Sequence, residues 1–197
     1  DILKDRLYTF RKDSPVRRAS QTVLFDIVVA LTKLMAPVLS FTAEEIWRML
    51  PETVRTEAKA ESVHIAMFPE VDPRWADPEL AARWETLLEV RTAVQAALEV
   101  KRRDKVIGAP LEARVVIEAN PERYEFLMRY QQDLSSFFIV SDVALTRVDR
   151  LAESAGVAIT VDKATGGKCE RCWNYRTAVG TSADHPTLCD RCIEAVR

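Results

Sequence analysis

Four cysteines near the end of the chain constrain its fold more than any other feature. They form two Cys-x2-Cys pairs, Cys169 with Cys172 and Cys189 with Cys192, and sixteen residues separate the pairs. Two thiolates three residues apart on a tight turn share one metal ion, and two such turns complete a tetrahedron. The pattern therefore predicts one structural zinc (Zn) ion and no catalytic residues there, because four thiolates leave no open coordination position.

Two alternatives to this ligand set remain open at the level of sequence. The cysteines could form two disulfides or stay as free thiols. His185, four residues before Cys189, could replace a cysteine, although an exposed loop histidine is the simpler interpretation. Residues 166–197 contain too few apolar side chains to fold alone, so the metal would supply folding free energy on the order of 10 kcal/mol.

The first half of the chain reads as helices. Ser14-Pro15 and Asp77-Pro78 are typical helix starts, and Thr42 to Glu45 matches a capping box. We expect an antiparallel helical bundle over residues 1–104, with a polar connector at 51–61 and a short extended piece at 62–68. Trp47 and Trp84 fall on apolar stripes and are expected in the core, whereas the pattern does not assign Trp75.

The character of the sequence changes after the bundle. Alternating residues at 111–118, a helix start at Asn120-Pro121 and apolar runs at 137–145 and 157–161 predict a small α+β junction unit over residues 105–165. A short glycine hinge then leads to the zinc finger, residues 166–197. The fold class is thus mainly α: a helical bundle, a small α+β unit and a C-terminal four-cysteine finger.

Composition limits the function classes. The 197 residues carry a formal net charge of −2, so any nucleic-acid contact must come from local patches. The longest apolar run, 27–39, is broken by Lys33 and Pro37, which predicts neither a membrane span nor a signal peptide. Clustered cysteines without a secretion signal point to the reducing cytosol. The chain lacks an initiator Met and starts within a helical pattern, so we expect a fragment of a longer protein.

Two regions have the composition of an RNA contact. In the finger, Trp173 stands beside basic side chains, a combination that stacks on an unpaired base and binds its phosphate; these are Lys168, Arg171 and Arg176. The alternative is that Trp173 packs over the metal site as a small core. Residues 1–18 have a net charge of +3 and form the second candidate, with Arg11, Arg17 and Arg18 among the basic residues.

These motifs resemble one known family. Residues 168–173 (Lys-Cys-Glu-Arg-Cys-Trp) and 188–192 (Leu-Cys-Asp-Arg-Cys) are similar to the C-terminal zinc finger of bacterial isoleucyl-tRNA synthetases. Residues 5–10, 36–47, 62–65 and 90–94 resemble the anticodon-binding helical domain of the same family, in the same order. The resemblance covers nearly the whole chain.

The resemblance implies a tRNA-recognising part of an isoleucine–tRNA ligase. The partners would be an isoleucine tRNA and the catalytic domain upstream in the same polypeptide, in a cytoplasmic, monomeric, ATP-dependent enzyme. The chain has no His-Ile-Gly-His-like or Lys-Met-Ser-Lys-Ser-like motif, the family's ATP-site signatures, so we expect this part to be non-catalytic.

Two other function classes compete with this interpretation. The finger could be a purely structural zinc ribbon that touches no RNA. A DNA-repair glycosylase of the formamidopyrimidine type has a finger with similar cysteine spacing, but it needs an N-terminal Pro-Glu and a Gly where this chain has Trp173.

Overall fold

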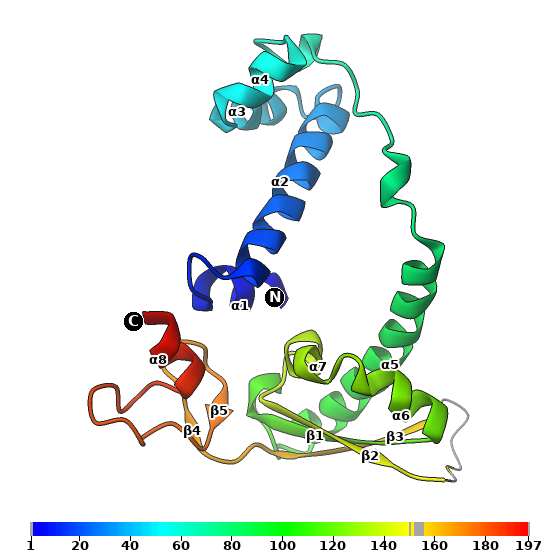
Figure 1. The fold of residues 1–197 in the computed structure, drawn as a ribbon, viewed down its shortest axis with the longest axis vertical. Helices are drawn as coiled ribbons and strands as arrows, with labels where there is room; N and C mark the ends of the chain where they lie inside the picture. Colours follow the sequence, from blue (N-terminus) through cyan, green and yellow to red (C-terminus); the bar gives the residue numbers. More distant parts are fainter. Residues whose placement is uncertain (1, 150, 152–155, 197) are drawn as a thin grey trace. The chain divides into compact units, whose positions relative to one another are not determined.

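The computed structural model describes residues 2–149, 151 and 156–196 (Figure 1). The chain divides into two compact units. Residues 12–76 form the helical unit, and residues 1–11 together with 77–197 form the α/β–finger unit. None of the helices that the structure describes has the length and apolar content that crossing a bilayer requires.

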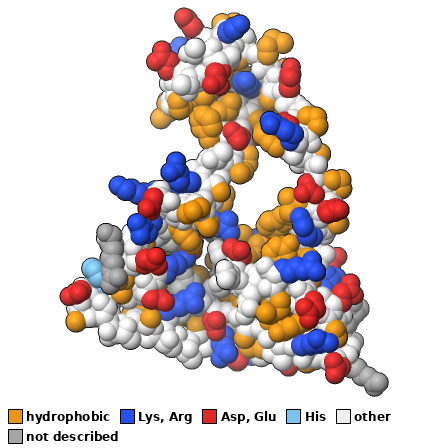
Figure 2. Space-filling model, in the orientation of Figure 1, with side chains coloured by type: hydrophobic (Ala, Val, Ile, Leu, Met, Phe, Trp, Pro, Cys, Tyr) orange, Lys and Arg blue, Asp and Glu red, His pale blue; other side chains and the backbone are white. Residues whose placement is uncertain are grey.

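The helical unit is built on one long helix and two short ones. Its elements are α2 (Pro15–Met35), α3 (Ser40–Met49), α4 (Glu52–Ala58) and the 3-10 turns η1 (Val63–Ile65) and η2 (Pro73–Trp75). The predicted helix start at Ser14-Pro15 is confirmed, and the helix ends before Pro37, whose ring cannot continue it. Hydrophobic side chains remain exposed on this unit, for example Val23, Ile27 and Leu31 of α2 (Figure 2).

Three local predictions for this unit are wrong. The supposed capping box does not start α3, because the N-cap is Leu39 and no side chain caps the helix. The nearby Glu44 instead accepts hydrogen bonds from the Ser62 hydroxyl at 2.8 Å and the Val63 N–H at 3.1 Å. The connector at 51–61 contains α4, and the expected extended piece contains η1. Glu44 thus ties the later turn to α3.

Trp47 is the centre of the helical unit's core, as predicted. Its side chain is completely buried, and its Nε1 donates to the Ala60 carbonyl at 3.2 Å. The core also contains Ala36, Ala43, Val54 and Val63. Trp75, which the sequence left unassigned, is 70% exposed.

Replacing these two tryptophans separates core from surface. Trp47→Ala removes a fully buried ring and leaves a carbonyl without its donor, so we expect the free energy of unfolding of the helical unit to fall by about 3–5 kcal/mol. Trp75→Ala, the matched control, should change it by less than about 0.5 kcal/mol. Urea unfolding followed by circular dichroism measures both. Equal losses in the two variants would contradict the assigned core.

The α/β–finger unit contains a three-stranded sheet in the order β2-β1-β3. The strands are β1 (Ala113–Ala119), β2 (Asp142–Arg147) and β3 (Val157–Lys163). β1 pairs in parallel with β2 and antiparallel with β3. The parallel pair needs a crossover, which α6 (Pro121–Met128) and α7 (Gln131–Phe138) provide. The apolar run expected as a strand from residue 137 therefore begins inside α7, and its strand starts only at Asp142.

One face of β1 is buried and the other is not. Alternate residues from Ala113 to Ala119 are buried, as the sequence pattern predicted. They share a core with α6, α7 and the buried face of α5 (Pro78–Arg103). The opposite face carries the ion pair between Arg114 and Asp142, 3.2 Å apart.

Helix α5 belongs to this core. The sequence pattern places α5 in a helical bundle that ends at residue 104. In the structure, Leu87, Val90, Val94 and Leu98 lie in the same core as the sheet residues. The predicted start is confirmed, since the Asp77 carboxylate accepts from the Leu80 N–H at 2.9 Å. The prediction that Trp84 lies in the core is wrong. Its side chain is 45% exposed and meets the Phe137 ring edge-on, with ring centroids 5.6 Å apart.

Candidate metal centre and RNA-facing surface

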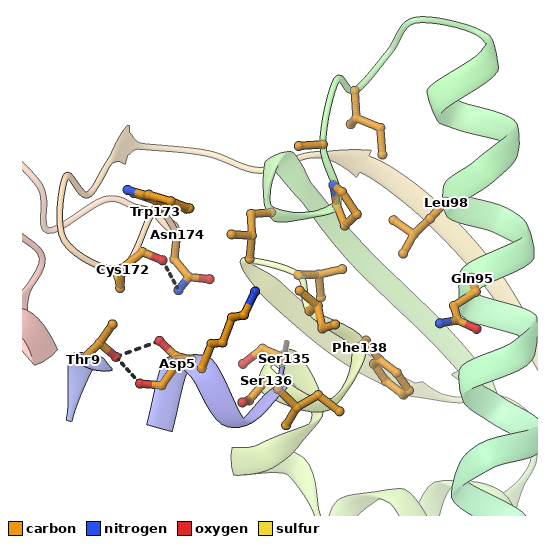
Figure 3. A pocket seen from close by; sticks show the side chains of 18 of the residues that line it. Asp5, Thr9, Gln95, Leu98, Ser135, Ser136, Phe138, Cys172, Trp173 and Asn174 are labelled. Atoms are coloured by element: carbon orange, nitrogen blue, oxygen red, sulfur yellow. Dashed lines mark hydrogen bonds between the residues drawn. The ribbon is translucent and has the colours of Figure 1, made fainter. Parts of the chain in front are cut away.

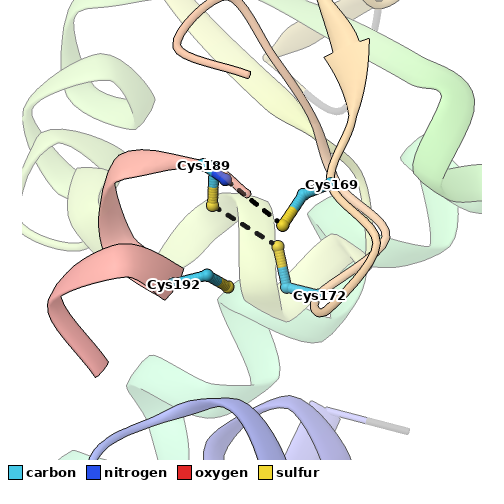
Figure 4. Close-up of side chains that lie close together, drawn as sticks. All are labelled: Cys169, Cys172, Cys189 and Cys192. Atoms are coloured by element: carbon cyan, nitrogen blue, oxygen red, sulfur yellow. Dashed lines mark hydrogen bonds between the residues drawn. The ribbon is translucent and has the colours of Figure 1, made fainter. Parts of the chain in front are cut away.

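The four cysteine sulfurs lie together although they come from two separate turns (Figure 4). All four Sγ atoms are within 4.8 Å of one another, and those of Cys172 and Cys189 are 3.7 Å apart. A tetrahedral zinc ion with Zn–S bonds of about 2.3 Å spaces its sulfurs by about 3.8 Å, whereas a disulfide requires about 2.05 Å. The cluster is a structural zinc site for one ion. The cysteines are unbridged, and His185 is not part of the cluster.

The titration of the four thiols also favours a bound cation. Burial raises the pKa of the Cys169 thiol, but backbone N–H donors outweigh it and lower the pKa to about 6; Cys189 supplies one of them, at 3.4 Å. Burial and the neighbouring Cys172 charge raise the pKa of both Cys189 and Cys192. Four thiolates cannot share this space without compensation, and a divalent ion supplies it.

Short backbone elements hold the ligands in place. Strands β4 (Gly167–Lys168) and β5 (Tyr175–Arg176) form a hairpin whose loop carries the first cysteine pair. Helix α8 (Asp190–Val196) begins directly after Cys189 and carries Cys192. Gly166, expected as a hinge, has φ +92° and packs so closely on the hairpin that a Cβ would overlap the Arg176 backbone. The backbone of Gly166 therefore packs directly against the backbone of Arg176 where the finger begins.

The two glycines of the finger with the same φ allow a matched test. Gly166→Ala should displace the hairpin, because a methyl group there overlaps backbone atoms and also strains a left-handed residue. Gly180→Ala has the same φ of +92° but meets nothing within 4 Å, so it carries only the strain. We expect zinc to transfer to a chromophoric chelator much faster from Gly166→Ala than from Gly180→Ala. Equal transfer rates would contradict the close approach.

Trp173 follows the second ligand and is exposed. Its backbone N–H donates to the Cys169 carbonyl at 2.8 Å, and its φ of 65° is left-handed, a strained conformation for a bulky residue. The side chain is 61% exposed, and the Lys168 Nζ lies 5.9 Å from the ring centroid. The apolar groups packed on the cysteines are Val179 and Leu188. The structure thus shows an exposed ring, not the small core of the alternative.

The other residues predicted to contact RNA have varied surroundings. Lys168 and Arg176 are exposed on neighbouring strands of the hairpin, near Trp173. Arg11 and Arg18 are exposed and Arg17 is half-buried. Arg11 ends the first segment of the α/β–finger unit, while Arg17 and Arg18 belong to the helical unit. Whether they act together stays a prediction.

Arg171 does not have the free surface position that the sequence suggested. It is half-buried, and its guanidinium donates to the carbonyls of Tyr8, at 3.2 Å, and Thr9. Both carbonyls belong to the last turn of α1 (Ile2–Thr9). Its Nη1 is also 3.8 Å from the Cys192 sulfur. Arg171 therefore connects the metal site to α1.

Sequence reasoning missed two further connections. Arg191 binds Asp5 of α1 through two hydrogen bonds of 2.7 and 2.8 Å. Ser141 is fully buried; its hydroxyl donates to the Leu111 carbonyl and accepts from the Tyr175 N–H at 2.7 Å, which joins β5 to the α/β part. These partners are 30 to 186 residues apart, so no local signal could have found them.

A cavity of about 780 Å³ lies between α1, α5, the end of α7 and the first cysteine turn (Figure 3). Apolar residues line most of it, among them Leu98 and Phe138. Trp173 and Asn174 line it on the finger side, and Gln95 on the α5 side. The exposed ring of Trp173 thus borders a largely apolar hollow that charged side chains such as Glu99 and Arg102 also line.

Comparison with known proteins agrees with this architecture. Residues 1–117 match the family described as the anticodon-binding domain of tRNA ligase, and residues 166–195 match a zinc finger found in FPG and IleRS. The chain is 46% identical, over 98% of its length, to the isoleucine–tRNA ligase of Syntrophotalea carbinolica. It is 45% identical to that of Geobacter sulfurreducens and 47% identical to that of Desulfitobacterium hafniense, over its whole length.

The described residues form helices and a small sheet that carry a four-cysteine zinc finger. With the family match over more than half of its length, the chain belongs to the anticodon-binding domain family of tRNA ligases. It spans about a fifth of the length of the curated relatives it matches: 21% of the first two and 22% of the third.

Proposed function

We propose that this chain is the tRNA-recognising C-terminal part of an isoleucine–tRNA ligase. ATP-dependent attachment of isoleucine to tRNA would take place in an upstream domain of the same polypeptide, and this part would be non-catalytic. The described residues support that division: the metal site is closed by four thiolates and holds no open position for chemistry. A cytoplasmic, monomeric parent enzyme completes the proposal.

The exposed ring of Trp173 on a metal-fixed turn is the observation that carries the RNA-binding role. A rigid platform loses little entropy when a base stacks on it, and stacking contributes about 1–3 kcal/mol per base. Lys168 and Arg176 on the same hairpin are placed to attract the adjacent phosphates. Arg11, Arg17 and Arg18 remain candidates for the stem phosphates, while we assign Arg171 to holding α1.

The competing classes account for fewer of these observations. A purely structural ribbon needs no exposed aromatic residue in a strained backbone conformation. A DNA-repair glycosylase shares the finger type, but the anticodon-binding match over residues 1–117 has no place in that class.

Binding of the zinc-loaded chain to an isoleucine tRNA transcript tests the proposal. Fluorescence anisotropy should show tighter binding to this transcript than to one of the same length whose anticodon loop has been replaced. Equal affinity for the two transcripts would contradict anticodon recognition and leave only general attraction to phosphate.

The stacking role is tested by two replacements of one residue. Trp173→Ala and Trp173→Gly both remove the ring, so tRNA affinity should fall by about tenfold or more. Glycine accepts the φ of 65° without strain, so the Gly variant should keep zinc at least as well as the wild type. Affinity and zinc content are measured on the same samples. Unchanged tRNA affinity in fully metallated Trp173→Gly would contradict the stacking role and leave the finger a purely structural one.

A further inference from the structure

The two cysteine pairs share a second residue type besides their ligands. Each has an arginine directly before its second cysteine: Arg171 in Cys-Glu-Arg-Cys and Arg191 in Cys-Asp-Arg-Cys. Both arginines reach the same element, helix α1, which is more than 160 residues away in the sequence. Both metal-binding turns of the finger therefore bind the same helix through an arginine.

Arg191 contacts side chains of α1 and of the residue that follows it. Its two terminal nitrogens bind the two carboxylate oxygens of Asp5, a paired geometry that fixes both distance and orientation. Its guanidinium also lies 5.0 Å from the centroid of the Phe10 ring. The Thr9 hydroxyl also donates to the Asp5 carboxylate, at 2.7 Å (Figure 3). Both partners of the ion pair are largely shielded from water, with side chains 34% and 23% exposed.

Arg171 binds the backbone of α1. It donates to the Tyr8 and Thr9 carbonyls, which have no partner within the helix because they belong to its last turn. A cation at the carboxyl end of a helix is also favoured by the helix dipole. Arg171 therefore caps the C-terminal end of α1 by donating to its last carbonyls.

Helix α1 is short and buries little of its own surface among the described residues. It has eight residues, fewer than an isolated helix needs to persist in water, and Thr9 is its one buried residue among those described. Ile2 packs partly against the core. Arg6 pairs with Asp133 of α7 at 3.2 Å, but Asp133 is 64% exposed and such a pair contributes little.

We propose that Arg171 and Arg191 form a zinc-dependent clamp that holds α1 on the finger, so that docking of α1 and zinc binding are thermodynamically coupled. Each arginine sits between two metal ligands, so its backbone position depends on the ion. Without zinc the two turns separate and the arginines no longer face one helix. Coupling between two binding events is reciprocal, so breaking the clamp on the α1 side must weaken zinc binding.

The first test changes α1 and leaves the finger sequence intact. Asp5→Asn removes the charge that Arg191 binds but can still accept from Thr9. We expect its zinc affinity, measured by competition with a chromophoric chelator, to fall by about tenfold. Asp133→Asn, the matched control, removes the ion pair with Arg6 of α1 and should leave zinc affinity within about twofold of the wild type. Unchanged zinc affinity in Asp5→Asn would overturn the proposal.

The second test follows α1 itself. Amide hydrogen exchange of residues 5–10 in the 197-residue chain should be slow with zinc bound and at least about tenfold faster after the metal is removed by a chelator. Amides of β1, in the sheet, serve as the internal reference and should keep their protection. If residues 5–10 stay equally protected without zinc, the clamp does not depend on the metal. Neither readout involves RNA, so its outcome is independent of the proposed tRNA role.

Discussion

The coordination of one zinc ion by four buried thiolates is the interaction on which the C-terminal part of the molecule depends. Among the described residues, the partly buried hydrophobic side chains packed on the cysteines are Val179 and Leu188. Such a segment cannot offset its loss of conformational entropy by burial alone, and a structural zinc ion contributes on the order of 10 kcal/mol. The position of Trp173, the hairpin and the two arginines that reach α1 all follow from the same ion.

Local signals explain what the sequence predicted well. Ligand spacing identifies the metal site because both members of a pair lie on one turn, and Asp77-Pro78 identifies a helix start because the cap is three residues from its donor. The alternation around Val115 identifies β1 for the same reason. Each of these features depends on residues within one turn or one strand.

The errors concern partners far apart in the chain. Glu44 looked like part of a helix start, but its carboxylate is used by a turn 18 residues later. Trp84 falls on the apolar stripe of α5, yet it reaches only the edge of Phe137. Nothing local distinguishes Asp5 from the other acidic residues, although it binds an arginine 186 residues away. Arg171 was predicted to be a surface cation because its partners in α1 are more than 160 residues away in the sequence.

The charge balance of the finger limits how it could attract RNA. It carries five basic and four acidic residues, and four thiolates with one divalent ion add a net charge of −2. Arg171 and Arg191 use their donors on α1. Under the proposed function, recognition there would rest on the exposed ring of Trp173 and on a few cations such as Lys168, not on bulk charge.

Titrating zinc into the metal-depleted chain while measuring its affinity for isoleucine tRNA tests this account most directly. The account predicts that affinity for the transcript rises in step with added zinc and reaches its maximum at one ion per chain. It also predicts that the gain disappears for a transcript without the anticodon loop. The same high affinity before and after zinc addition would contradict the claim that the metal organises the RNA-facing surface.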